Sequence, residues 1–205
     1  MYHRKPWRIA EDVGIVRAML DEAGFTETES HLNEWNYNRK WEEPDHYSSR
    51  VRPTAKGAAF VAAVMCECQG LPVDMLMYYD LRPNICWCGP FAPHVYDIRP
   101  PYWALYYWAE LAEYGTCVAS SCENDNIYTC AALSGNGKRV RILIARYHED
   151  DNYDTPRDVT VALPDGWKVK HLRITDSTGM DRKAEAVATL TLESNAIALM
   201  EIEEY

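Results

Sequence analysis

A short polar and aromatic segment, His31-Leu-Asn-Glu-Trp-Asn-Tyr37, contains the residue types that bind and cleave sugars. The Glu34 carboxylate can attack an anomeric carbon or stabilise an oxocarbenium-like transition state. The Trp35 indole can stack on the apolar face of a pyranose, while the amides of Asn33 and Asn36 can hydrogen-bond its hydroxyl groups. The same segment also fits an exposed loop glutamate beside a core tryptophan.

A second candidate group lies at the end of a later apolar run, where Tyr79 precedes Asp80. The Asp80 carboxylate suits binding of a sugar hydroxyl or orientation of a neighbouring group, and it equally suits capping of a turn. Trp41, Trp87 and Trp103 are candidates for the walls of a sugar cleft, although most tryptophans pack in cores. We predict substrate contacts for Tyr79, Asp80 and Trp41 in addition to the segment around Glu34.

Apolar spacing predicts the elements that position these groups in the first 116 residues. Expected are helices over Ile9–Ala23, Thr54–Gln69 and Tyr102–Tyr114, a short strand ending near Glu34, a buried strand over Val73–Tyr79, and loops over Asn36–Ser49 and Arg82–Pro101. Strands that alternate with helices are parallel and joined by helical crossovers. Because catalytic residues of such folds lie at the C-terminal ends of strands, we expect Glu34 and Asp80 at one common end.

The pattern changes after Gly115. Ile127–Leu133 and Val140–Tyr147 flank Gly135-Asn-Gly137, which is typical of a β-hairpin. Further strands are expected around Val159, Val161 and Leu163, over Trp167–Ile174, at Leu190–Leu192 and over Ile197–Ile202. Short alternating strands with regular turns indicate an antiparallel β-sandwich. The predicted fold is therefore α/β over residues 1–116 and all-β over residues 117–205.

Charge and hydropathy argue against two classes of partner. The 205 residues carry a formal net charge of −10 without a basic stripe, which disfavours nucleic-acid binding. No apolar run reaches the roughly 18 residues of a membrane span, and the basic N-terminus lacks the apolar core of a signal peptide. We therefore expect no membrane partner and a cytoplasmic location, although a longer parent protein would change the second expectation.

Metal and cofactor chemistry is not expected. The seven cysteines do not match zinc-site spacing and are expected as free thiols, with Cys66 and Cys68 packed in a helix. The run His148-Glu-Asp-Asp151 is interpreted as a solvated loop and not as a calcium site. No P-loop, dinucleotide-binding glycine motif or nucleophilic serine motif occurs.

Four segments resemble, in order, the C-terminal part of clan A glycoside hydrolases, and most of all family 39, which contains β-xylosidases and α-L-iduronidase. They are Leu20-Asp-Glu-Ala-Gly-Phe25, His31-Leu-Asn-Glu-Trp-Asn36, Gly57-Ala-Ala-Phe60 and Asp74-Met-Leu-Met-Tyr-Tyr-Asp80. In that family the seventh barrel strand ends in a Thr-Glu-Trp-Asn-like motif whose glutamate is the nucleophile. An eighth strand, an aromatic helix and a β-sandwich follow. The resemblance therefore implies a partial (β/α) barrel, made of the last two strands and their helices, with Glu34 as the nucleophile of a retaining glycosidase.

Two features depart from the family pattern. Asn33 directly before Glu34 resembles the acid/base motif of the fourth strand, but the single strand that follows before the sandwich favours the nucleophile position. A retaining mechanism needs two carboxylates about 5–5.5 Å apart, and the strand with the acid/base glutamate would lie before Met1. The resemblance thus implies a truncated xylosidase- or iduronidase-like chain that has a glycoside as ligand and is inactive alone.

The sequence leaves three alternatives open. The missing strands can come from another chain, or the chain can be a carbohydrate-binding module that uses the aromatic residues around Trp35 and Trp41. It can also be a remnant that is kept for its sandwich or for contacts between copies. Because two parallel strands have two open edges, we expect a homo-oligomer.

Overall fold

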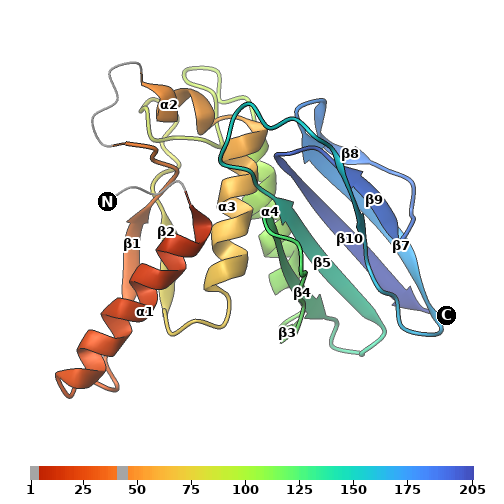
Figure 1. The fold of residues 1–205 in the computed structure, drawn as a ribbon, viewed down its shortest axis with the longest axis horizontal. Coiled ribbons are helices and arrows are strands. Elements are labelled where there is room, and N and C mark those ends of the chain that lie inside the picture. Colours follow the sequence, from red (N-terminus) through yellow and green to blue (C-terminus); the bar gives the residue numbers. More distant parts are fainter. Residues whose placement is uncertain (1–4, 41–45) are drawn as a thin grey trace.

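The computed structural model describes residues 5–40 and 46–205, with the helices and a pair of parallel strands at one end and antiparallel strands at the other (Figure 1). The helices are α1 (Pro6–Glu22), α2 (Tyr47–Val51), α3 (Ala55–Cys68) and α4 (Pro100–Ala112). The strands are β1 (His31–Trp35), β2 (Met75–Tyr78), β3 (Thr116–Val118), β4 (Ile127–Leu133), β5 (Arg139–Arg146), β6 (Arg157–Thr160), β7 (Trp167–Asp176), β8 (Gly179–Lys183), β9 (Thr189–Leu192) and β10 (Ala196–Glu204).

The first sheet is a parallel pair. β1 and β2 run side by side, with Leu32 beside Leu76 and Trp35 beside Tyr78. The chain between the two strands passes through α2 and α3, so the predicted helical crossover is present. Among the described residues this sheet has two strands.

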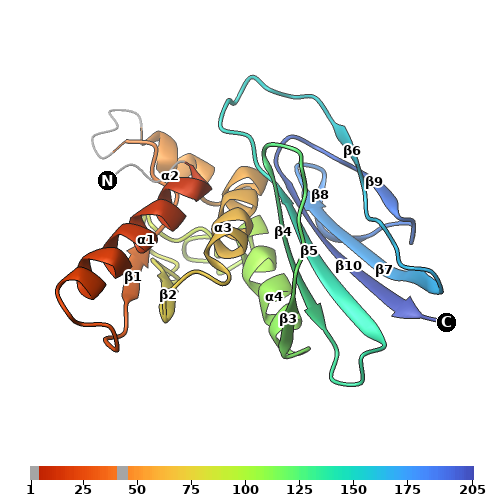
Figure 2. The same ribbon diagram turned by 60° about the horizontal axis from the view of Figure 1, so that its bottom comes forward.

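Helix α3 lies between the parallel pair and the large antiparallel sheet in both views (Figures 1 and 2). The helix can be contacted from several sides because many of its buried residues are small, including Ala58, Ala59, Ala62 and Ala63. Gly57 allows the closest approach, since a Cβ there would lie 2.1 Å from the Arg52 carbonyl oxygen. Cys66 and Cys68 are buried in this helix, as predicted.

One hydrophobic core joins the helices to the large sheet. It contains Phe60 of α3, Tyr107 of α4, Leu143 of β5 and Leu199 of β10. This core crosses the predicted boundary between residues 116 and 117, where β3 begins. The division of the chain at this boundary stays a prediction.

The antiparallel strands form two sheets that face each other. The larger has the strand order β3-β4-β5-β10-β7-β8, and β6 pairs with β9 in the smaller one. A second core between them contains Ile144 and Met200 from the large sheet and Val159 and Leu192 from the small one. Two face-to-face antiparallel sheets agree with the predicted β-sandwich. The expected hairpin joins β4 to β5, and Gly137 takes the positive φ of +72° that its turn requires.

The structure corrects several expected elements. A short helix, α2, occupies the end of the expected 36–49 loop, because a five-residue helix is too short to show apolar periodicity. Strands β3 and β8 were not expected, since β3 has three residues and β8 is a polar edge strand without alternation. Strand β6 ends at Thr160, so Val161 and Leu163 lie beyond it.

The largest correction concerns β2, which was expected to be a buried strand. Its Met75 and Met77 side chains are 45 % and 39 % exposed. Leu76 and Tyr78 pack against the α3 core on the opposite face. The strand is apolar on both faces, but only one of these faces is covered.

Candidate functional site

Glu34 and Asn33 are exposed side by side at the C-terminal end of β1. Regular alternation would turn Glu34 toward α3, on the same face as Leu32. Instead, two residues of β1 lie between the pairs Leu32–Leu76 and Trp35–Tyr78, against one residue of β2, so β1 contains one extra residue. This bulge lets Leu32 and Trp35 both join the core, while Glu34 stays on the exposed face.

Trp35 takes the core position that the sequence left as an alternative. It is 2 % exposed, and its ring packs edge-on against Tyr78 with the centroids 5.4 Å apart. Its indole N–H has no hydrogen-bond partner among the described residues. The ring is thus enclosed in this structure, and its predicted stacking on a sugar stays a prediction.

Asn36 joins the ends of the two parallel strands. Its buried Nδ2 donates to the carbonyl oxygens of Tyr79 at 2.5 Å and Trp87 at 2.7 Å. Its Oδ1 accepts the backbone N–H of Tyr37 at 2.7 Å. This amide therefore positions the strand ends and the loop after β2, and its predicted role as a sugar ligand stays a prediction.

Asp80 lies buried at the end of β2, at the same end of the pair as Glu34. Its carboxylate accepts the backbone N–H of Arg82 at 2.9 Å and two guanidinium hydrogen bonds from Arg82 at 2.9 and 2.6 Å. Arg82 also donates to the Tyr79 hydroxyl at 3.0 Å. The hydrogen bonds and charge of Asp80 raise the pKa of Arg82. Asp80 therefore caps this turn and orients Arg82, and its predicted contact with a sugar hydroxyl stays a prediction.

Arg82 was not predicted as a site residue from the sequence. In the structure its side chain lies at this strand end and is 67 % exposed. Its signal is the Asp-x-Arg spacing, which lets an aspartate accept both the backbone and the side chain of the arginine. Fixed in this way, the guanidinium presents donors to solvent beside the parallel pair. Such donors suit hydroxyl or carboxylate oxygens of a sugar.

The partly exposed aromatic pair at this end is Tyr79 and Trp87, whose ring centroids lie 6.2 Å apart. The Arg52 guanidinium lies over the Trp87 ring at 4.1 Å and donates to the carbonyl oxygens of Tyr37 and Cys86. Trp103 instead packs among tyrosines of α4, and Trp41 lies outside the described residues. Of the predicted aromatic residues that the structure describes, Tyr79 and Trp87 thus both lie at this strand end and are partly exposed.

The acidic run His148–Asp151 lines a separate polar cavity of about 480 Å³ with Tyr47 and Asn126. Lys56 of α3 donates to Asp151 at 2.6 Å, and the Tyr47 hydroxyl donates to the same carboxylate. Burial opposes ionisation of Asp151, but the hydrogen bonds from Lys56 and Tyr47 lower its pKa overall. These contacts connect the helical part to the β5–β6 loop. The described residues contain no group of three or more His, Cys, Asp or Glu side chains suited to a metal ion.

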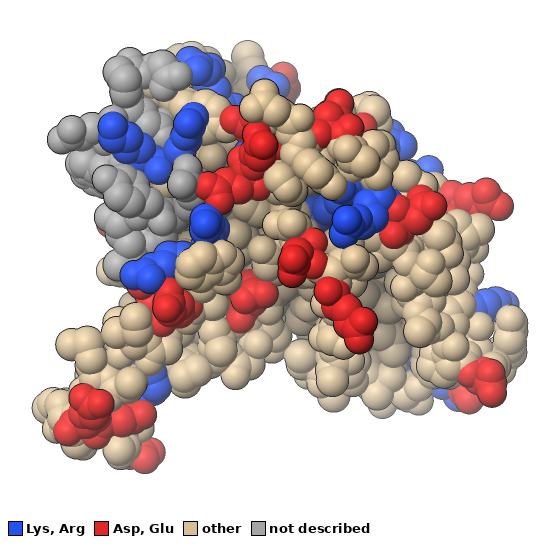
Figure 3. All heavy atoms as spheres, in the orientation of Figure 1, with Lys and Arg blue, Asp and Glu red and all other residues tan. Residues whose placement is uncertain are grey.

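Surface charge and helix character relate to the two classes of partner that the sequence disfavours, nucleic acids and membranes. Acidic side chains are spread over both the helical and the sheet parts of the face in Figure 3, in line with the net charge of −10. Among the described helices, none combines the length and the apolar character that crossing a membrane requires.

Solved structures of glycoside hydrolases share this fold. A glucosidase from Croceicoccus marinus is 18% identical and has a TM-score of 0.70 over 99% of this chain and 52% of its own. A family 39 glycoside hydrolase from Xanthomonas axonopodis pv. citri is 17% identical, with a TM-score of 0.65 over 96% of this chain and 49% of its own. An α-L-arabinofuranosidase from Thermotoga maritima is 15% identical, with a TM-score of 0.58 over 98% and 49%.

The fold is that of part of a glycoside hydrolase. The chain spans about half the length of the glycosidases named above, and the predicted resemblance to family 39 is confirmed at the level of fold. No family model and no curated protein matches the sequence. At these identities the likeness concerns the fold alone, so the roles of individual residues have to be argued from the site.

Proposed function

We propose that this chain is the C-terminal unit of a retaining glycosidase of the xylosidase and iduronidase type, with Glu34 at the nucleophile position. The observation that carries the proposal is the bulge in β1, which keeps the Glu34 carboxylate exposed at a strand end between two core residues. Catalytic groups of (β/α) barrels lie at that end of the strands. The chain's length relative to the glycosidases of the same fold supports the same interpretation.

The parallel pair is best understood as the last two strands of a barrel. Apart from their pairing with each other, the described residues add no strand to the outer edges of β1 and β2. Exposed apolar residues also lie on this part of the chain, with Met75 and Met77 on the uncovered face of β2 and Ile15, Val16 and Met19 on α1. Apolar surface of this kind marks a contact site. We propose that further barrel strands cover it, supplied by another part of a longer chain or by a second chain.

We further propose that the 205 residues alone do not hydrolyse glycosides. A retaining mechanism needs a second carboxylate that acts as acid and base. Among the described residues, the second carboxylate at the ends of the parallel strands is Asp80, and Arg82 holds it in place. The absent general acid costs about 10²–10⁴-fold in rate, and the absent walls remove substrate positioning as well.

The test is a panel of aryl glycosides, including xyloside, glucoside, galactoside, arabinofuranoside and iduronide, with Glu34→Gln as the control variant. We expect no turnover above the background of the variant. Turnover that Glu34→Gln abolishes would overturn the inactive-chain part of the proposal and would support the nucleophile assignment. A rate that Glu34→Gln leaves unchanged would remove Glu34 from the chemistry.

Glycan binding without chemistry is the second candidate function. The partly exposed rings of Tyr79 and Trp87, together with the Arg82 guanidinium, form a surface on which a pyranose can stack and hydrogen-bond. Isothermal titration with xylo-oligosaccharides measures this directly. Binding that Tyr79→Ala weakens and Glu34→Gln leaves unchanged would favour a binding module, whereas binding that depends on both residues would favour the glycosidase unit.

A further inference from the structure

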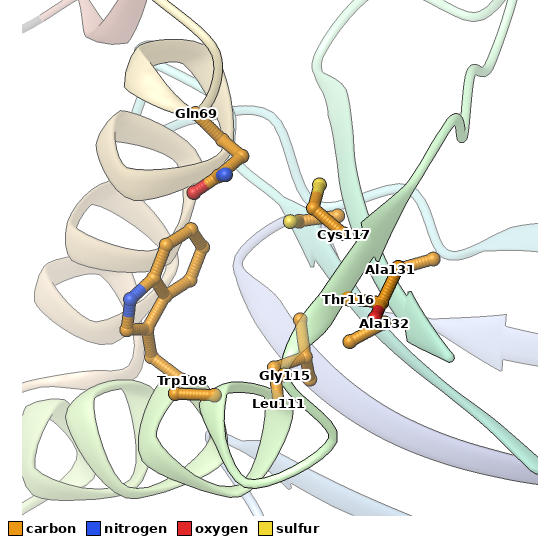
Figure 4. A pocket seen from close by; sticks show the side chains of 10 residues that line it. Gln69, Trp108, Leu111, Gly115, Thr116, Cys117, Ala131 and Ala132 are labelled. Carbon is orange, nitrogen blue, oxygen red and sulfur yellow. The ribbon is translucent and has the colours of Figure 1, made fainter. Parts of the chain in front are cut away.

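A cavity of about 250 Å³ lies away from the candidate sugar site, between the C-terminal parts of α3 and α4 and the strands β3 and β4 (Figure 4). Its wall includes Gln69 after α3, Trp108 and Leu111 of α4, and the side chains of Cys117 and Cys130. These two thiols belong neither to the candidate sugar site nor to the parallel strand pair. Their arrangement suggests a chemical role for this cavity.

Strand register puts Cys117 and Cys130 on one face. Cys117 of β3 pairs with Ala132 of β4, so Cys130 is its diagonal neighbour on the face that carries Ala132. Ala132 and Cys130 both belong to the core against α3 and α4. Figure 4 shows Cys117 on the cavity side of the strand with a second sulfur atom close to it. Cys130 is the other sulfur-containing residue of the cavity wall.

The two thiols differ in accessibility. Cys117 is exposed, whereas Cys130 is buried. Burial, followed by the charge and hydrogen bonding of the neighbouring Cys117 thiol, raises the pKa of Cys130 to about 12. A third thiol, Cys66 of α3, is also buried, and burial raises its pKa as well. Because the thiolate is the reactive form, an oxidant should meet Cys117 first.

We propose that Cys117 and Cys130 are an oxidation site. A small disulfide such as oxidised glutathione converts the two thiols reversibly into an internal Cys117–Cys130 disulfide. In the first step the Cys117 thiolate attacks glutathione disulfide, which gives a mixed disulfide and releases one glutathione. In the second step the Cys130 thiolate attacks the Cys117 sulfur and releases the second glutathione. Two protein thiols are oxidised, one glutathione disulfide is reduced, and both thiol protons end on glutathione at neutral pH.

Edge strand β3 must move slightly for this bond to form. Diagonal neighbours of an antiparallel pair have Cα atoms about 7–8 Å apart. The two Cα atoms of a disulfide lie at most about 7 Å apart. β3 has three residues, lies at the edge of its sheet, and follows the positive-φ turn at Gly115. A small inward shift of this strand is therefore the change that oxidation requires. The bond would fix the turn between α4 and the sheet.

The experiment treats the full chain with oxidised glutathione and measures intact mass, peptide linkage and melting temperature. We expect the loss of two hydrogen atoms, a cross-linked peptide pair that contains Cys117 and Cys130, and reversal by dithiothreitol. Closing this loop should raise the melting temperature by about 5–10 °C. Cys117→Ser should abolish the cross-link, and Cys86→Ser, which removes an exposed cysteine of the loop after β2, should leave it unchanged.

Two results would overturn the proposal. One is a stable glutathione adduct on Cys117 without internal cross-linking, and the other is a dominant disulfide between any other pair, such as Cys66 with Cys130. Because Cys130→Ser places a hydroxyl in the core, the matched variant is Cys130→Ala, which should retain glutathione on Cys117. The same treatment in urea should give mixed pairings, and selective Cys117–Cys130 linkage there would show that the fold does not direct it.

Discussion

Strands β10 and β2 are both apolar, but the molecule covers them very differently. In β10 the residues Ile197 and Leu199 face the helices, while Ala198 and Met200 face the small sheet, and all four are buried. In β2 one face packs on α3 and the other leaves its methionines exposed. The sandwich and its helical layer thus bury both faces of their central strand, whereas among the described residues the parallel pair keeps one uncovered face and two unpaired edges, which our proposal assigns to further strands.

The largest expected difference between the two regions is in the free energy of unfolding that is lost when an apolar side chain is removed. Leu143→Ala in the core between helices and sheet should lower the free energy of unfolding by about 3 kcal/mol, because it leaves a cavity. Met77→Ala on the exposed face of β2 should change it by less than about 0.5 kcal/mol. Urea unfolding followed by tryptophan fluorescence measures both variants. Equal losses would mean that the face of β2 is already covered in solution.

A second prediction concerns the junction of the two parallel strands. Asn36→Ala removes three hydrogen bonds and leaves the carbonyl oxygens of Tyr79 and Trp87 without this donor. We expect a loss of about 2 kcal/mol in the free energy of unfolding. Asn152→Ala is the matched control, because that amide bonds to Asp150 in an exposed loop and should cost little. If the two variants lose the same stability, Asn36 does not hold the strand ends together.

Much of this architecture could be predicted from apolar spacing, but the fine geometry of the site could not. Helices α1 and α4 are visible in the sequence because each buries one face, and α3 is visible as a long apolar run that ends before Gly70. The bulge that exposes Glu34 depends on how β1 aligns with β2, which lies far away in the chain. The fixation of Asp80 by Arg82 depends on a turn conformation, and α2 and β3 are too short for any period to appear.

A smaller effect is expected from the contact between α3 and the β5–β6 loop. The pKa of Asp151 is lowered in the folded state, so this group stabilises the fold above its unfolded pKa of about 3.9, and the contribution is lost as pH falls through the folded value. Because the carboxylate is about half exposed, the effect should stay below about 1 kcal/mol. As the pH is lowered from neutral to acidic, the melting temperature of Asp151→Asn should fall less steeply than that of wild type. Asp150→Asn, in the same loop, should follow wild type, and a wild-type slope in Asp151→Asn would contradict the assignment.

The central claim is that the parallel pair is an unfinished part of a barrel, and light scattering over the micromolar range tests it most directly. We expect the mass of the full chain to rise with concentration, because open strand edges and exposed apolar side chains favour association. The double variant Met75→Ser and Met77→Ser should weaken this association. Met180→Ser, which removes an equally exposed methionine from the edge of the sandwich, should not. A wild-type chain that stays monomeric at every concentration, with no response to the double variant, would contradict the account.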